Sequence, residues 1–342
     1  MAKINSKLEF YRFKLNPRQD DFKTFKDFTL DELKGKSSYD GAKIMKLLFT
    51  HFITSLDGKY SKDEKIKKQI KLEKRTAINK HLRNQPKYLS ESNIICGVIN
   101  GGSYGRDRII GDVNNPEEGS QLGKSKTVLQ YYFFLLYLPI DHNEGCFIIH
   151  SNSKEETITN IFRSFISHLF KATRYNKVNI ESFCPKSFQD EFKKGAIIQT
   201  IEFKDSKVDN THTTDGTSDT IGKYDIRIEI APKNKDMSIT SFGKLKSILA
   251  SYIFGKETHH KKLQDFDEVK VATKNPVDNS TRTFEWNTKD EDFVPIIYLD
   301  GRVRTNDDDT PDFDDLETLC RNYLTDEILP ELRPDLNVTK AK

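Results

Sequence analysis

The sequence predicts an α+β fold of mostly antiparallel sheet with packed helices, divided into two lobes. Several segments alternate apolar and polar residues with the period of a half-buried strand. Others repeat apolar residues at helical spacing. The chain has 342 residues, of which 35% are hydrophobic, so it can bury a sizeable core in two domains or one large one.

The first ninety residues contain one expected strand and three expected helices. Residues 8–15 alternate apolar and basic side chains, as a strand does. Thr29 is expected to cap a short helix, and 39–56 carries its apolar residues on one helical face. The lysine-rich segment 62–83 is expected to form the third helix, which ends at Pro86 because proline cannot continue it.

The middle of the chain changes to strand-like patterns. We expect strands at 94–99, 108–113, 128–138 and 146–150. The first two flank a glycine-rich turn and predict a hairpin, and the polar residues 119–126 predict a connector. A helix is expected from Ser153, where a capping-box pattern precedes apolar residues that repeat at helical spacing up to Phe170.

A polar segment separates the two expected lobes. Residues 206–222 are rich in Gly, Thr and Asp and predict a flexible loop. The lobe before it, 1–205, contains a helical basic insertion at about 29–87. The lobe after it, 223–342, ends in a helix. The remaining expected elements are strands near 178 and at 196–203, 224–230, 266–273, 281–286 and 293–299, and helices at 187–192, 239–253 and about 314–332.

Charge is distributed unevenly along the chain, although the net charge is only +3. From Lys62 to Lys87 there are ten Lys and Arg and three Asp and Glu, a local net charge of +7. From Thr305 to Glu317 there are seven Asp and Glu and no Lys or Arg, a local net charge of −7. The acidic residues Asp312, Asp314 and Asp315 are expected to cap the last helix. A second interpretation, which the sequence leaves open, is that 307–317 docks on 62–87, in the same chain or in a partner, and gates access to it.

The lysine-rich segment is the clearest candidate for a binding surface. If it is helical, residues three and four apart form a ridge of positive charge. Such a ridge gains affinity for a phosphate backbone by counterion release, without reading bases. A solvated lysine-rich helix without a ligand is the alternative interpretation. The expected nucleic-acid-binding residues are Lys65, Lys67, Lys68, Lys71, Lys74, Arg75, Arg106 and Arg108.

The two arginines come from a glycine-rich segment, Gly101 to Arg108. Its glycines let a backbone approach closely, while the arginines can pair with phosphates and Tyr104 can stack. The segment is neither a P-loop nor a dinucleotide fingerprint, because no Gly-Lys-Ser/Thr and no helical pattern follows. An ordinary hairpin turn is the alternative interpretation.

The sequence contains no catalytic motif that would assign an activity, and no metal or cofactor is expected. The four cysteines lack CxxC spacing; Cys96 and Cys146 lie in apolar runs and predict buried free thiols in a reducing compartment. Glu268 and Lys270 form the ExK triplet found in metal-dependent PD-(D/E)xK nucleases, with Asp225 or Glu229 as a further acid. A nuclease is therefore a rival function.

The order of the elements resembles that of a known family. The quoted segments are the strand LEFYRFKL, the strand and helix FIIHSNSKEETITNIFRSFISHLF, the second such unit YDIRIEIAPKNKDMSITSFGKLKSILASYI, and the terminal helix DDLETLCRNYLTDEILPEL. This order is similar to that of the RexA exclusion proteins of temperate phages and, more distantly, of the KwaB subunit of Kiwa defence systems. The resemblance covers most of the chain and rests on element order; the longer N-terminal half departs from it.

The resemblance implies a homodimeric, non-enzymatic protein that binds duplex DNA without sequence preference and acts in phage exclusion or antiphage defence. It supplies no DNA-contacting residue, because the basic segment lies in the half that departs from the family. A second defence-system subunit is a further expected partner, and an interaction subunit that binds no nucleic acid is a third function. The longest apolar run, 128–140, is too short to span a bilayer and the N-terminus lacks an apolar signal region. We therefore expect a cytoplasmic protein without membrane insertion.

Overall fold

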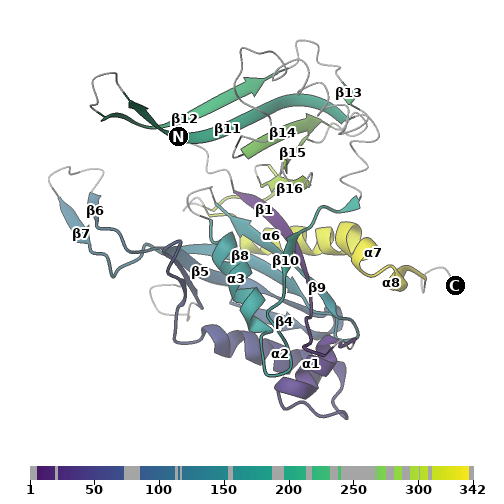
Figure 1. Ribbon diagram of the computed structural model, residues 1–342. Helices are drawn as coiled ribbons and strands as arrows, with labels where there is room; N and C mark the ends of the chain where they lie inside the picture. The colour runs from purple at the N-terminus through teal and green to yellow at the C-terminus, as the bar shows by residue number, and fades with distance from the viewer. Residues whose placement is uncertain are drawn as a thin grey trace. The chain divides into compact units, whose positions relative to one another are not determined.

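The chain folds as two compact units, which a computed structural model describes for most residues (Figure 1). Unit 1 comprises Met1–Ser182 and Leu299–Lys342, and unit 2 comprises Phe183–Tyr298. Helices and antiparallel sheet make the fold α+β, as predicted. The units divide near residues 182 and 298 rather than at 206–222, so the C-terminal helix belongs to unit 1. The described residues are 6–19, 22–72, 85–111, 115, 118–152, 157–186, 196–212, 218–231, 238–239, 266, 268–274, 281–286, 293–299, 301–306 and 310–338.

Unit 1 is built on an antiparallel sheet. Its strands, in spatial order, are β10 (Ile180–Ser182), β1 (Lys7–Lys14), β9 (Glu144–Ser151), β8 (Gln130–Tyr137), β5 (Ile94–Ser103), β3 (Lys68–Lys71) and β2 (Ser61–Asp63). A further strand, β4 (Lys87–Leu89), also pairs with β5. The strands expected at 8–15, 128–138 and 146–150 are thereby confirmed.

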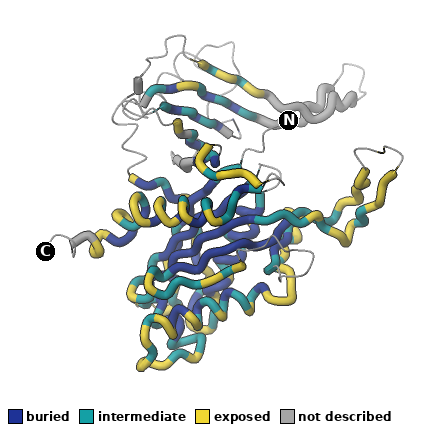
Figure 2. The backbone as a smooth tube through the Cα atoms, turned by 180° about the vertical axis from the view of Figure 1, so that it is seen from behind, coloured by how far each residue is buried: buried dark blue, intermediate teal, exposed yellow. Residues whose placement is uncertain are grey.

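Helices cover both faces of this sheet. On one face lie α1 (Phe25–Glu32), α2 (Gly41–Leu56) and α3 (Thr159–Leu169), whose apolar residues share one core with alternate strand residues. On the other lie α6 (Phe313–Tyr323), a π-helical turn, η4 (Leu324–Ile328), and α7 (Leu329–Leu332), followed by α8 (Asp335–Val338). Figure 2 shows the sheet between them as buried. Burial on both faces explains why β8 is apolar without alternation.

The helices in unit 1 agree with the sequence, apart from two starts. Helices expected at 39–56, from Ser153 to Phe170 and at about 314–332 are present as α2, α3 and α6–α7, but α3 begins at Thr159, and Thr157 and Ile158 before it are not helical. Thr24, not Thr29, caps α1: its hydroxyl accepts the Asp27 N–H at 3.2 Å, and Asp27 accepts the Thr24 N–H at 2.8 Å. Thr29 instead lies inside the helix, where its hydroxyl donates to the Phe25 carbonyl at 2.8 Å. The capping pattern expected at 153–156 lies outside the described residues.

The prediction of a hairpin around the glycine-rich turn is wrong. β5 continues through that turn to Ser103 and pairs with β8 and β3. β6 (Arg108–Gly111) pairs instead with β7 (Gly119–Leu122), which occupies the expected connector. Gly102 explains the continuation: a Cβ at this residue would lie 2.0 Å from the Val128 carbonyl oxygen, so only glycine lets the two backbones approach.

Unit 2 contains a second antiparallel sheet. Its order is β12 (Ser218–Ile230), β11 (Ala196–His212), β14 (Glu268–Lys274), β15 (Thr281–Trp286) and β16 (Phe293–Tyr298), and β13 (Ser238–Ile239) also pairs with β11. Most of the expected loop 206–222 is therefore paired strand, because backbone hydrogen bonds form a ladder whether or not the side chains are apolar. The helices expected at 187–192 and 239–253 lie outside the described residues, apart from Ile239, which lies in β13.

All four cysteines are free thiols. Cys96 and Cys146 are buried, as the sequence predicts, and so is Cys320, whereas Cys184 is half-buried. Burial raises the pKa of Cys96 to about 12 and that of Cys146 further still. These buried thiols therefore stay protonated near neutral pH, the state in which a cysteine is a poor nucleophile.

His150 on β9 is a buried side chain whose ring lies near that of Tyr132, with the centroids 6.2 Å apart. The residue is 0% exposed, and neither ring nitrogen has a hydrogen-bond partner among the described residues. Burial lowers the pKa of His150 from 6.5 to about 3. The ring is therefore neutral in the folded protein at physiological pH.

We expect His150 to make the protein sensitive to acid. Because its folded pKa is lowered, only the unfolded state takes up this proton between pH 6.5 and about 3. The stability present above pH 6.5 is then lost on acidification, at up to about 1.4 kcal/mol per pH unit. The free energy of unfolding, obtained from urea denaturation, should be measured at several pH values in this range. Its slope against pH should be smaller in His150→Leu by the equivalent of one proton. The exposed His168→Leu serves as the control, and equal slopes in both variants would contradict the assignment.

Candidate nucleic-acid interface

The lysine-rich segment begins as a β-hairpin, so the helix predicted for 62–83 is wrong for residues 62–71. β2 and β3 pair with Ser61 opposite Ile70. The Asp63 carboxylate accepts the N–H groups of Lys65 and Ile66 at 3.0 and 3.2 Å, which fixes the turn. β3 in turn adds to the sheet, with Ile70 opposite Gly101 of β5. Backbone pairing to a distant strand thus decides the local structure.

The hairpin turn lies against the glycine-rich segment. The Tyr104 N–H donates to the Lys67 carbonyl at 3.0 Å, and the Gly105 N–H donates to the Lys124 carbonyl at 3.0 Å. The ammonium groups of Lys62 and Lys67 lie 5.8 and 5.7 Å from the centroid of the Tyr104 ring. Two basic segments that are separate in the sequence therefore meet in space.

We call this surface the basic corner. Its members are Lys62, Lys65, Lys67, Arg106, Arg108 and Lys124, all of them exposed. Three carboxylates, Asp63, Glu64 and Asp107, lie among these six cations, which leaves a local net charge of +3. Such a surface can bind an anionic backbone but offers no fixed set of groups for reading bases.

Two ion pairs hold part of the basic corner in place. Lys67 Nζ lies 2.9 Å from Glu64, which raises the pKa of Lys67 and lowers that of Glu64. Lys124 lies 3.8 Å from Asp107. Lys65, Arg106 and Arg108 make no ion pair with any described residue, so their charges remain available to a ligand.

Lys68 and Lys71 lie in different surroundings from the basic corner. The half-buried Lys68 ammonium donates to the Thr157 carbonyl just before α3, and burial lowers its pKa. Lys71 is half-buried, with its ammonium 5.6 Å from the centroid of the Tyr60 ring. Lys68 therefore joins the hairpin to α3 rather than facing outward. Lys74 and Arg75 lie outside the described residues.

The structure adds two cations that sequence reasoning left out. Lys62 lies within the basic segment, but its position beside Tyr104 depends on the hairpin turn. The Lys124 carbonyl meets the Gly105 N–H because the chain leaves along β6 and returns along β7, which pairs with it. The sequence carried a signal for Lys62, since it is part of the lysine run. It carried none for Lys124.

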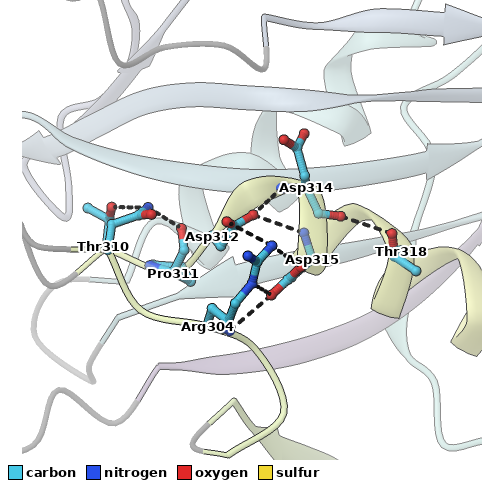
Figure 3. A network of polar contacts seen from close by, with 8 residues as sticks. Arg304, Thr310, Pro311, Asp312, Asp314, Asp315 and Thr318 are labelled. Atoms are coloured by element: carbon cyan, nitrogen blue, oxygen red, sulfur yellow. Dashed lines mark hydrogen bonds and ion pairs between the residues drawn. The ribbon is translucent and has the colours of Figure 1, made fainter.

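Asp312 and Asp315 of the acidic segment make their contacts with groups of the same chain at the start of α6 (Figure 3). Asp312 caps the helix, as predicted, by accepting the N–H groups of Asp314 and Asp315 at 3.0 and 3.1 Å. Arg304 makes a two-pronged pair with Asp315 at 2.7 and 2.8 Å and reaches Asp312 at 3.3 Å. The Arg304 guanidinium lowers the pKa of Asp315 to about 2. Residues 307–309 lie outside the described residues.

Among the described residues, the basic and acidic segments meet at their last members. Lys87 on β4 lies 2.8 Å from Glu317 on α6, which raises the pKa of Lys87. The Glu317 side chain is 11% exposed. This pair is distinct from the basic corner, and neither Asp312 nor Asp315 contacts that corner.

The residues considered for a nuclease lie in unit 2. Glu268 and Lys270 are at the start of β14, while Asp225 and Glu229 are on β12. β11 runs between these two strands, which places their backbones two strand spacings, roughly 9.6 Å, apart. Lys270 lies opposite Glu202 on β11 and Glu285 on β15, and the Glu202 carboxylate pairs with Arg227 at 2.7 Å.

Comparison with protein-family models and with curated protein sequences gave no match for this chain. In the part of the chain that the structure describes, no three or more His, Cys, Asp and Glu side chains gather as a metal-binding group would. None of the described helices is long and apolar enough to cross a membrane.

We expect Lys68 to contribute to stability rather than to ligand binding. Lys68→Met removes a charged donor from the Thr157 carbonyl and should lower the free energy of unfolding by about 1–2 kcal/mol. The exposed neighbour provides the control: Lys65→Met should change stability by less than about 0.5 kcal/mol. Urea denaturation of the two variants measures the difference. Equal stabilities would contradict the role of Lys68.

Proposed function

We propose that this protein binds duplex DNA without sequence preference, through backbone phosphates at the basic corner. The observation that carries the proposal is the meeting of the hairpin turn and the glycine-rich segment around Tyr104. It gathers exposed lysines and arginines from three parts of the sequence onto one surface. A phosphate backbone is the ligand that such a surface favours, because each neutralised phosphate releases counterions.

The composition of the basic corner favours sequence-independent binding. Lysines act as point charges towards phosphates, whereas base recognition needs side chains held rigidly at base edges in a groove. Lys62 is on β2, Lys65 and Lys67 come from the turn that follows it, and Arg106 precedes a two-stranded ribbon; all four are exposed. Exposed side chains of this kind suit contact with phosphates better than base reading.

The biological setting comes from the resemblance to RexA exclusion proteins. We propose a cytoplasmic homodimer that acts in phage exclusion or antiphage defence, without catalysis of its own. The dimer would present two basic corners to one duplex and raise its affinity through a high effective concentration of the second site. A second defence-system subunit is the further partner that this setting suggests.

Removing charge from the hairpin turn should weaken DNA binding. The variant carries Lys62→Gln, Lys65→Gln and Lys67→Gln. If all three lysines contact phosphates, the slope of log affinity against log salt should fall by about 2–3, and affinity at moderate salt by about tenfold or more. Fluorescence anisotropy on two duplexes of unrelated sequence, across a salt series, measures both quantities.

A matched control separates this surface from total charge. Lys36, Lys46 and Lys171 are exposed lysines elsewhere in unit 1, and changing them to Gln removes the same charge. That variant should bind nearly as the wild-type protein does. Equal losses in the two variants would refute the basic corner as the site. No binding by the wild-type protein at low salt would refute DNA binding itself.

A further inference from the structure

A pocket of about 490 Å³ lies in unit 1, where one end of the sheet meets the C-terminal helices. This volume falls in the range of small-molecule sites, about 300–1,000 Å³. One wall comes from the chain that enters β5 and the chain that leaves β8, and the other comes from α6, the π-helical turn η4, α7 and α8. None of the residues of the basic corner lines this pocket, so it is a separate feature.

More of the pocket's lining surface is apolar than polar. Ile94 and Tyr137 are paired across β5 and β8, and each is 3% exposed. The other apolar lining residues are Ile140, Leu324, Leu329 and Leu336. Because removing apolar surface from water is favourable, this lining favours an apolar group of a ligand over water.

The helical wall of the pocket departs from α-helical geometry. In η4 the Leu329 N–H donates to the Leu324 carbonyl, five residues back, and both residues line the pocket. Pro330 favours this departure, because it has no N–H to donate to the carbonyl four residues before it. Thr325, which is exposed, lines the pocket from the same turn. Turns of this type are rare, and they occur frequently at functional sites.

Two arginines line the pocket, and they differ in whether their charge is already paired. The buried Arg333 guanidinium makes a two-pronged pair with Asp141, at 2.9 Å for both contacts, and reaches Asp335 at 2.7 Å. Arg321 is exposed and makes no ion pair with a described residue. On the opposite wall, Glu91 is also exposed and also lacks an ion pair within the described part of the chain. The pocket therefore offers a ligand one positive and one negative charge, from opposite walls.

We propose that this pocket binds a free amino acid with an aromatic or branched apolar side chain. The Arg321 guanidinium pairs with the carboxylate of the ligand, the Glu91 carboxylate pairs with its ammonium group, and the apolar lining receives its side chain. Pairs of this kind are charge-assisted hydrogen bonds, which are stronger than neutral ones. A ligand with a single charge satisfies only one of the two residues, so a zwitterion fits better than an organic acid or an amine. The inference does not depend on DNA binding at the basic corner.

Calorimetric titration of the full-length protein with a set of related compounds tests each contact. L-Phenylalanine and L-leucine carry both charges, 3-phenylpropionate lacks the ammonium group, and phenethylamine lacks the carboxylate. At least one of the two amino acids should bind at one site per chain, with a Kd on the order of 0.1–1 mM. Each compound with a single charge should bind about fivefold more weakly than L-phenylalanine or worse, because it loses one charge-assisted contact. L-Lysine, whose side chain is charged, should also bind more weakly, because the lining is apolar.

Three variants then assign the contacts to residues. In Arg321→Gln, L-phenylalanine should bind no better than phenethylamine, and in Glu91→Gln no better than 3-phenylpropionate. Thr325→Trp should fill the pocket and abolish binding. All three residues are exposed, so each variant should unfold at the same temperature as the wild-type protein.

Arg18→Gln provides the matched control, because Arg18 is an exposed arginine that does not line the pocket. This variant should bind the amino acid as the wild-type protein does. The inference is overturned if neither amino acid binds the wild-type protein, or if Thr325→Trp binds as tightly as the wild-type protein. An unchanged preference among the compounds in Arg321→Gln and Glu91→Gln would also overturn it.

Discussion

Burial of both faces of one sheet is the constraint on which the rest of unit 1 depends. On one side, Phe52 of α2 stacks on Phe134 of β8 with ring centroids 5.0 Å apart. On the other, Tyr323 of α6 meets Phe10 of β1 edge to face at 5.7 Å. With helices on both sides, the sheet has little face left for a ligand. Solvent reaches it mainly at strand edges and at turns beyond the sheet.

The basic corner and the ribbon of β6 and β7 lie at such strand edges and turns. The hairpin of β2 and β3 extends the sheet past β5, and its turn carries exposed lysines. Gly102 lets the chain near Val128 pass close to β5, and the ribbon of β6 and β7 leaves and returns between Gly105 and Lys124. The same local geometry therefore builds both the basic corner and the exposed ribbon.

The sequence predicts those elements whose pattern depends on their own residues. The apolar run of β8, the helical spacing in α2 and the Asp312 cap were all recognisable, because each is determined locally. Residues 61–71 were not: Ile66 and Ile70 are four apart, as on a helix face, yet Ile66 is 37% exposed and Ile70 is 0% exposed. The deciding partner of Ile70 is Gly101 on β5, which no local pattern reveals. Lys68 contacts Thr157 and Lys124 contacts Gly105, and these partners are also far apart in the sequence.

The net charges of the two oppositely charged segments suggest that one segment docks on the other, but their described residues make different contacts. Arg304 lies just outside the acidic run, yet it engages Asp312 and Asp315 and so removes part of that negative charge. Lys87, the last residue of the basic run, is held by the nearly buried Glu317. That pair joins β4 to α6 and lies apart from the basic corner. The positive charge available to a ligand is accordingly concentrated on the hairpin, where Lys62 on β2 and Lys65 in the turn are exposed.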